Sequence, residues 1–345
     1  MALIGDCQMA AHMLTHMGEA THHDPFWDDA AAALLAAVLV HVCSGEERTL
    51  TRVWHTVQDI KADLLPAASD PFAVRTFAGH ATLEDRVRSS INETLLTRLA
   101  FLADPVLQAA TSTCDFRAGD LQAAEQPVTV FLSIPAAHGR RLRPLTRLLL
   151  QSLLAPLTHD IHLTSDGRRK LRPVLAMLDE FPQLGRMDVL EHGIAVCAGY
   201  GVRMAMVCQD EDQIRSAYGS HQSITANCTT ICSIPGFSAH SLQTVARWGG
   251  DHAVAHLAKQ RRQGWRGSSE SESEARVPVL NPRDMLQRGR EEVLVFTLGC
   301  APVWLPKAAY YRLRAFRGLY DEHLPSPRMS THDEQPEVRR QWLDA

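Results

Sequence analysis

The chain contains few lysines and no phosphate-binding loop of the Gly-x-x-x-x-Gly-Lys-Ser/Thr type. In such a loop, backbone amides cradle the phosphates of a nucleotide while the lysine neutralises them. None of the four lysines among the 345 residues follows a Gly or precedes a Ser or Thr; they are Lys61, Lys170, Lys259 and Lys307. A complete P-loop nucleotide site is therefore not encoded in this sequence.

The chain also lacks paired cysteines, long apolar runs and a large net charge, and each absence excludes a class of protein. The eight cysteines form no Cys-x-x-Cys pair, which indicates reduced, mostly buried thiols of a cytosolic protein. The longest apolar run, residues 30–42, suits a buried helix better than a bilayer span, and the first residues do not resemble a signal peptide. With 35 basic and 39 acidic residues, no overall field favours nucleic acid. We therefore expect a cytoplasmic chain whose place at a membrane, if it has one, comes through partners.

Hydrophobic periodicity divides the chain in two. Apolar residues recur every three or four positions over residues 4–121, which predicts helices, and Asp-Pro pairs at 24, 70 and 104 indicate turns or helix starts. From residue 126 the pattern changes to short β-prone runs that alternate with helical stretches. Strands are predicted at 128–134, 173–178, 204–208, 229–234 and 293–297, and helices at 142–154 and 187–198. This alternation predicts a parallel, doubly wound sheet, while the polar stretch 259–276 predicts an exposed loop and the last residues a disordered tail.

The most informative motif is an apolar run, residues 173–178, that ends in Asp179 and Glu180. Open α/β sheets place their ligand crevice at the carboxyl ends of the strands. In P-loop ATPases such a strand carries an acid that helps to hold Mg²⁺ and a Glu that orients the attacking water. The alternative interpretation is that Asp179 caps a nearby helix and that Glu180 is merely solvated.

The sequence from Asp179 to Met187, Asp-Glu-Phe-Pro-x-Leu-Gly-Arg-Met, resembles the hallmark of type IV secretion coupling proteins of TraG/TraD type. Three further segments resemble this family in order and spacing: 24–27, 198–203 and 218–228. The resemblance covers most of residues 1–320. It implies an α/β fold, a partial RecA-like P-loop ATPase sheet with an all-helical domain amino-terminal to most of it, and it matches the carboxyl-terminal portion of the family.

The resemblance also implies a domain organisation. Residues 1–125 would form the helical domain, with a remnant of the ATPase fold at its start. Residues 126–320 would form the later half of the ATPase domain, and residues 321–345 a disordered tail.

Site residues are implied in the same way. Glu180 and Gln209 match the catalytic positions, Asp179 matches the acid that binds the Mg²⁺ of an ATP–Mg²⁺ cofactor, and Gln209 has a plain strand-end hydrogen bond as its alternative. An arginine finger is not assigned, although Arg186 and Arg203 are the nearest candidates.

Clusters of cations could contact phosphates of a nucleic acid. The candidate residues are Arg140, Arg141, Lys259, Arg261 and Arg262. The first two continue into Arg143 and Arg147, and residues 168–172 form another basic cluster. A solvated face or loop is the alternative for each cluster.

The function implied is that of a truncated coupling protein in conjugative DNA transfer or type IV secretion. It would dock a relaxosome, with its relaxase and DNA, to channel components at the inner membrane, and the family is homo-hexameric. Because the lysine and the phosphate-cradling amides are missing, ATP hydrolysis by this chain alone is not expected. Two alternatives remain open, an ATPase half completed in trans by a separately encoded Walker A segment and a non-functional gene remnant.

Overall fold

The structure is a computed structural model that describes residues 2–16, 25–61, 68–234, 239–261, 268–288 and 292–319. The chain forms two compact units, residues 1–228 and residues 229–345, and each is described by itself. The predicted tail at 321–345 and the predicted starting signal at Asp24 lie outside the described residues. The domain boundary between residues 125 and 126 stays a prediction.

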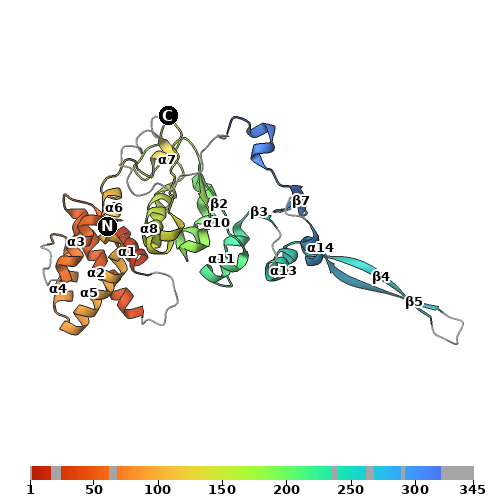
Figure 1. Ribbon diagram of the computed structural model, residues 1–345, viewed down its shortest axis with the longest axis horizontal. Coiled ribbons are helices and arrows are strands. Elements are labelled where there is room, and N and C mark those ends of the chain that lie inside the picture. The colour runs from red at the N-terminus through yellow and green to blue at the C-terminus, as the bar shows by residue number, and fades with distance from the viewer. Residues whose placement is uncertain are drawn as a thin grey trace. The chain divides into compact units, whose positions relative to one another are not determined.

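The first part of unit 1 is a bundle of helices (Figure 1). These helices are α1 (Ala2–Thr15), α2 (Pro25–Ser44), α3 (Leu50–Lys61), α4 (Pro71–Ala81), α5 (Asp85–Leu99), η1 (Ala100–Ala103) and α6 (Pro105–Ala110). The short helix α7 (Asp120–Ala123) lies apart from the bundle, and its Gln122 carbonyl accepts from the Leu171 amide at 2.8 Å, just before β1 (Val174–Leu178). The helical periodicity of the sequence is confirmed here. Asp70 and Asp104 also start helices as predicted, because their side chains accept backbone N–H groups of the turns that begin at Pro71 and Pro105.

Helix α2 is the central element of this bundle. Most of its residues 31–42 are buried, and α1, α4 and α5 pack around it. Residues 26–44 are long and apolar enough to cross a membrane by length and composition, but half of that span is buried inside the protein. A helix that is apolar on all sides suits the core of a bundle. The apolar run predicted to be a buried helix therefore lies within a longer core helix of 20 residues.

The second part of unit 1 contains a two-stranded sheet and short helices. Its elements are η2 (Ala136–His138), α8 (Gly139–Leu157), β1 (Val174–Leu178), η3 (Phe181–Leu184), α9 (Asp188–Glu191), α10 (Gly193–Val196), η4 (Cys197–Tyr200), β2 (Val202–Met206), α11 (Glu211–Tyr218) and α12 (Ile224–Asn227). The strands β1 and β2 run parallel, with Val174 opposite Val202 and Leu178 opposite Met206. The single helix predicted at 187–198 is instead divided into α9, α10 and η4.

One face of β1 is covered and the other is not. Val174, Ala176 and Leu178 pack on a core that α8 and the segments around the sheet form. Leu175 and Met177 point away from that core and are 60% and 72% exposed. Parallel sheets are normally covered on both faces, so this face of β1 is open in unit 1.

The strand predicted at 128–134 is wrong. Residues 127–135 form no ladder with any described strand, and Phe131 is 89% exposed. A β-prone run becomes a strand only when a neighbour supplies hydrogen bonds and a packing surface, and the described part of unit 1 offers this run neither.

Unit 2 is built on an antiparallel sheet. Its elements are β3 (Thr230–Ser233), α13 (Ala239–Trp248), β4 (Asp251–Arg261), β5 (Ser268–Pro278), α14 (Pro282–Gln287), β6 (Glu292–Thr297), β7 (Val303–Pro306), η5 (Tyr310–Arg312) and η6 (Arg314–Phe316). The sheet has the order β3-β6-β7, and Leu294 at its centre is fully buried with Leu280 and Met285. The prediction of a parallel sheet thus holds for β1 and β2 but is wrong for these strands.

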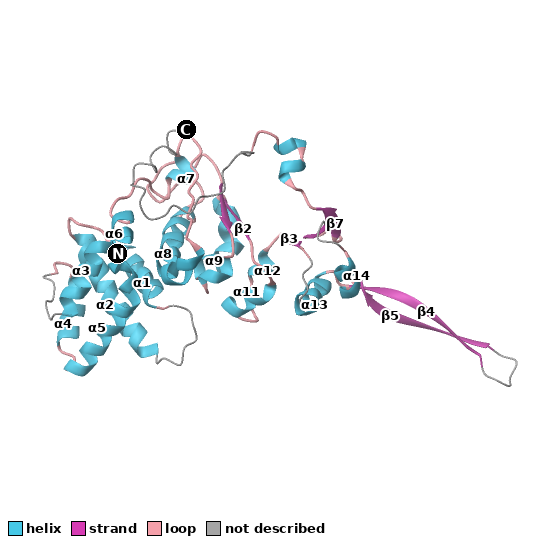
Figure 2. Ribbon diagram, viewed as in Figure 1, coloured by secondary structure: helices cyan, strands magenta, loops and turns pink. Residues whose placement is uncertain are grey.

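Residues 259–261 and 268–276 of the polar stretch belong to a long hairpin rather than a loop, and residues 262–267 lie outside the described part (Figure 2). In this hairpin β4 and β5 pair from Asp251 opposite Pro278 to Arg261 opposite Ser268. The sequence alternates Ser and Glu over residues 269–274. Because so polar a run has little in common with a half-buried strand, its periodicity did not indicate one.

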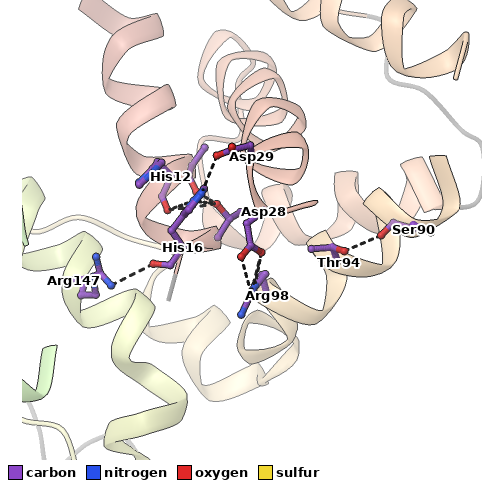
Figure 3. A network of polar contacts seen from close by, with 10 residues as sticks. His12, His16, Asp28, Asp29, Ser90, Thr94, Arg98 and Arg147 are labelled. Atoms are coloured by element: carbon purple, nitrogen blue, oxygen red, sulfur yellow. Dashed lines mark hydrogen bonds and ion pairs between the residues drawn. The ribbon is translucent and has the colours of Figure 1, made fainter. Parts of the chain in front are cut away.

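A half-buried ion pair fastens α5 to the start of α2 (Figure 3). The guanidinium of Arg98 donates two hydrogen bonds to Oδ1 of Asp28, at 2.9 and 3.0 Å, and one to Oδ2, at 2.9 Å. The two side chains are only 24% and 18% exposed. Charge-assisted, bidentate pairs of this kind are stronger than the usual surface ion pair.

We expect Asp28→Ala and Arg98→Ala each to lower the free energy of unfolding by about 2 kcal/mol, since each leaves a half-buried charge without its partner. The double variant should lose clearly less than the sum, which urea denaturation of all four proteins would measure. Fully additive losses would show that the pair contributes nothing beyond the packing of its side chains.

Candidate nucleotide site

The carboxyl ends of β1 and β2 meet at one edge of the small sheet. The amide of Val207 donates to the carbonyl of Leu178 at 2.9 Å, and the amide of Phe181 donates to the carbonyl of Val207 at 3.3 Å. These bonds extend the ladder past both strand ends. They place Asp179 and Glu180, which follow β1, beside the segment that leads from β2 to Gln209.

The backbone of Glu180 is unusual. It has a φ of +50°, and it is the one residue other than glycine with a positive φ in the described part of the chain. Its side chain is half-buried, and Gln183 Nε2 donates to Glu180 Oε2 at 3.3 Å. Left-handed backbone in a residue with a Cβ costs roughly 1 kcal/mol, and strained residues of this kind are enriched at functional sites.

The Asp179 side chain is exposed. It forms no hydrogen bond and no ion pair with the residues that the structure describes. The short helix η3 that follows begins after Glu180, and its first amides receive no side-chain cap. The capping interpretation of Asp179 therefore has no support in the geometry. The carboxylate is accessible to a ligand at the strand end.

Gln209 lies at the equivalent end of β2, with an exposed side chain. Its amide donates to Gln213 Oε1 at 3.1 Å, and the next residue, Asp210, caps α11 by accepting from the Gln213 amide at 2.9 Å. The turn after β2 is thus fixed by Asp210 and Gln213. The side-chain amide of Gln209 takes part in none of these bonds.

The electrostatics of this edge are acidic. Burial, followed by the carboxylates of Asp210, Glu180 and Glu211, raises the pKa of the Cys208 thiol to about 11. Burial is the larger cause of this rise, and the three carboxylates add to it. These carboxylates give the strand ends the sign of charge that a cation requires.

The residues present fit Mg²⁺ better than they fit a whole nucleotide. Mg²⁺ is commonly held by one or two carboxylates together with phosphate oxygens of a substrate, and Asp179 and Glu180 would be those carboxylates here. In the described residues no group of three or more His, Cys, Asp or Glu side chains could hold a metal without such help. A lysine-bearing loop for the phosphates has no counterpart in the sequence.

A buried arginine supports the loop that follows the acid pair. Arg147 on α8 is 7% exposed, and its guanidinium donates to the carbonyl of Arg186 at 3.0 Å and to the carbonyl of His16 at 3.3 Å (Figure 3). Its Nε has no hydrogen-bond partner in the described chain, and burial lowers its pKa. Arg147 therefore joins the end of α1 to the loop 179–187, and its assignment to a surface basic cluster is wrong.

The neighbouring end of α1 is tied to α2 by a second contact. His16 Nε2 lies 3.1 Å from Asp29 Oδ1, and the rings of His12 and His16 stack with 3.8 Å between their centroids (Figure 3). The loop after the acid pair is thus connected through Arg147 and His16 to the helical bundle.

The arginine-finger candidates differ in their surroundings. The guanidinium of Arg186 pairs with Glu191 at 3.0 Å, within its own chain. Arg203 is an exposed residue of β2. Neither position is assigned a role by the geometry.

The predicted basic clusters are partly occupied by internal contacts. Arg141 pairs with Asp104 at 2.9 Å, whereas Arg140 lies exposed at the start of α8. In the cluster at 168–172, Arg168 pairs with Asp120 at 2.6 Å, and Lys170 Nζ donates to two backbone carbonyls. Lys259 and Arg261 lie on β4, their side chains are outside the described part, and Arg262 lies wholly outside it.

The sequence interpretation missed one charged segment. Residues 307–319 contain four cations and no acid, and three aromatic residues lie among them. A run of 13 residues without a single carboxylate was the available signal. It was overlooked because it has neither helical nor strand periodicity.

Comparisons with known proteins agree with this fold and motif. The family model described as "Type IV secretory system Conjugative DNA transfer" matches residues 2–341, and the chain belongs to this family. Among its relatives, "Conjugal transfer protein TraG" of Escherichia coli is 27% identical, over 82% of this chain and 49% of the relative's length. "Protein VirD4" of Rhizobium radiobacter is 23% identical, over 92% of this chain and 46% of the relative. The chain thus spans about half the length of these relatives.

Solved structures show the same fold. "Plasmid coupling protein TrwB in complex with ADP and Mg2+" superimposes with a TM-score of 0.63 over 88% of this chain and 68% of that protein, at 15% identity. The unbound form of the TrwB coupling protein gives a TM-score of 0.63 as well. The fold of this chain is therefore that of the conjugative coupling proteins.

The clamp formed by Arg147 can be tested by Arg147→Met. We expect faster amide hydrogen exchange in residues 185–187, because the carbonyl of Arg186 loses its donor. The free energy of unfolding should change by less than about 1 kcal/mol, since removal of a buried charge offsets the lost hydrogen bonds. Arg140→Met, on the exposed surface of the same helix, is the control. Unchanged exchange in the loop would rule out the clamp.

Proposed function

We propose that this chain serves conjugative DNA transfer as the docking portion of a coupling protein, and that it does not hydrolyse ATP on its own. It would bring a relaxosome or its DNA to a type IV secretion channel. Family membership and the helical bundle of unit 1 support the docking role. The observation behind the absence of ATP hydrolysis concerns the acid pair at the end of β1. This pair and Gln209 lie at neighbouring strand ends, but the sequence contains no phosphate-binding loop to complete the site.

The chemistry explains why the acid pair alone is insufficient. In phosphoryl transfer the protein contributes mainly positioning and electrostatic stabilisation of the phosphates. Asp179 would help to hold Mg²⁺, Glu180 would orient a water and Gln209 would contact the γ-phosphate. Without a lysine and a row of amides, the phosphates have no partner to compensate for their charge.

Thermal unfolding tests nucleotide binding directly. A ligand at 100 times its Kd adds about 2.7 kcal/mol to the free energy of unfolding, which is readily seen as a rise in Tm. We expect Mg²⁺-ATP to leave the Tm of the wild-type chain and of Glu180→Gln unchanged. A clear rise in either protein would show that nucleotide binds without a P-loop. A chain that does not melt cooperatively would instead favour a non-functional remnant.

The docking role is tested by competition in mating cells. Expression of this chain in a donor that carries a full-length coupling protein should lower the frequency of plasmid transfer, because the relaxosome is diverted. Leu35→Asp, which places a charge in the core of the helical bundle, should abolish this effect. Unchanged transfer with a stably accumulated wild-type chain would contradict docking.

A second candidate function is an ATPase completed in trans, and the open face of β1 favours it. Leu175 and Met177, together with the unpaired run 128–134, offer apolar surface and a free strand edge to an additional β-strand. A polypeptide that carries a P-loop behind such a strand would supply both missing parts. The two halves would then share one sheet.

This candidate predicts ATP hydrolysis only in a mixture of the chain with a neighbouring gene product that bears a Gly-x-x-x-x-Gly-Lys-Ser/Thr loop. Phe131→Asp should weaken the association, whereas Val106→Asp, a similarly exposed apolar position on α6, should not. Equal association of both variants would remove the free edge from consideration.

A further inference from the structure

The segment that follows β7, residues 307–319, combines positive charge with exposed aromatic rings. We call it the aromatic–basic strip. Its cations are Lys307, Arg312, Arg314 and Arg317, and its aromatic residues are Tyr310, Tyr311 and Phe316. The three rings are 53%, 58% and 42% exposed. Three partly exposed aromatic side chains within seven residues, among four cations, form a surface suited to contact with a ligand.

The cations of the strip are available to a ligand. Arg312, Arg314 and Arg317 are exposed, and the described residues provide none of them with a carboxylate partner. The Arg312 guanidinium lies 5.7 Å from the centre of the Tyr311 ring, so charge and ring face lie side by side. This contrasts with the cluster at 168–172, where an arginine is neutralised by two acids.

The backbone of the strip is ordered by short turns. The amide of Arg312 donates to Ala309 at 2.8 Å, the amide of Phe316 to Leu313 at 3.1 Å and the amide of Leu319 to Phe316 at 3.0 Å. The first two bonds belong to η5 and η6, two separate helices of three residues each, and the third closes the turn that follows η6. Part of the entropy of ordering the strip is therefore already lost before a ligand binds.

We propose that the aromatic–basic strip binds single-stranded nucleic acid, with arginines on the phosphates and Tyr310, Tyr311 and Phe316 stacked on bases. Single-strand sites combine a positively charged track with rings on which successive bases stack. An anionic membrane is the competing ligand, but surface-bound segments usually present one continuous amphipathic helix. Two isolated turns do not form such a face.

The inference deepens the proposed function, and it rests on that function for the origin of the strand. The strip itself is defined by exposed side chains of unit 2 alone. It needs neither Asp179 nor a bound nucleotide. Its failure would therefore leave the docking role to the other surfaces of the chain.

Fluorescence anisotropy with labelled dT20 tests the proposal on the full chain. Four phosphate contacts predict a salt slope, log K against log salt, of about −2.8, and Arg312→Gln/Arg314→Gln/Arg317→Gln should reduce it to about −0.7. Tyr310→Ala/Tyr311→Ala/Phe316→Ala should weaken binding about tenfold or more with an unchanged slope, while Tyr310→Phe/Tyr311→Phe retains affinity.

Matched controls separate the strip from general charge. Arg75→Gln/Arg86→Gln/Arg117→Gln removes the same charge from exposed positions of unit 1 and should bind dT20 like wild type. An equal loss in this control, or no dT20 binding by the wild-type chain, overturns the proposal. Binding of phosphatidylserine vesicles instead of dT20 overturns it in favour of a membrane contact.

Competition in mating cells distinguishes failure of the single-strand site from failure of the docking role. If the strip variants bind dT20 like wild type while the chain still lowers plasmid transfer, the strip assignment fails and the docking role stands. If dT20 binding depends on the strip but transfer is unaffected, the nucleic-acid site stands and the docking role fails.

Discussion

The parallel ladder between β1 and β2 is the constraint on which the candidate site depends. Five residue pairs in register bring both carboxyl ends to one edge, because parallel strands point the same way. The ladder is held by the apolar core beneath Val174, Ala176 and Leu178 rather than by contacts among the site residues. Consequently the acid pair can be exposed and sparsely bonded while its position is still determined by burial elsewhere.

The helical bundle and the sheet of unit 1 are connected by polar contacts as well as by apolar packing. Arg147 donates one hydrogen bond to a backbone carbonyl at the end of α1 and one to a backbone carbonyl in the loop after β1. Because the acceptors are backbone atoms, these bonds do not depend on the side chains at the two acceptor positions. The cost is a desolvated guanidinium without a carboxylate counter-charge. Such an arrangement adds little net stability but restricts where the loop can lie.

The parts of the fold that could be predicted are those whose signal is local. The apolar run before Asp179 and the Asp-Pro starts at 70 and 104 carry their own structural reason, and each is present in the structure. The run 128–134 has the same β-prone composition as β1, but strand formation also requires a partner, which composition does not reveal. The hairpin β4–β5 was missed for the opposite reason, since it is paired yet polar.

The site was predictable to a similar degree. The resemblance to the family located Asp179, Glu180 and Gln209, because such a resemblance follows the order of residues along the chain. The roles of these three residues are proposals. The resemblance could not distinguish buried from exposed arginines, so Arg147 and the exposed Arg140 were placed in one cluster although one supports a loop and the other faces water. Exposure is a property of packing among distant segments, and no spacing rule contains it.

The left-handed backbone of Glu180 sets two selective pressures against each other. Glycine at this position would adopt a φ of +50° without steric penalty, and asparagine would tolerate it better than glutamate does. Selection for folding alone would therefore replace this residue, whereas selection for a carboxylate at the strand end would keep it. Position 180 therefore sets ease of folding, which favours glycine, against the carboxylate that the proposed nucleotide chemistry requires.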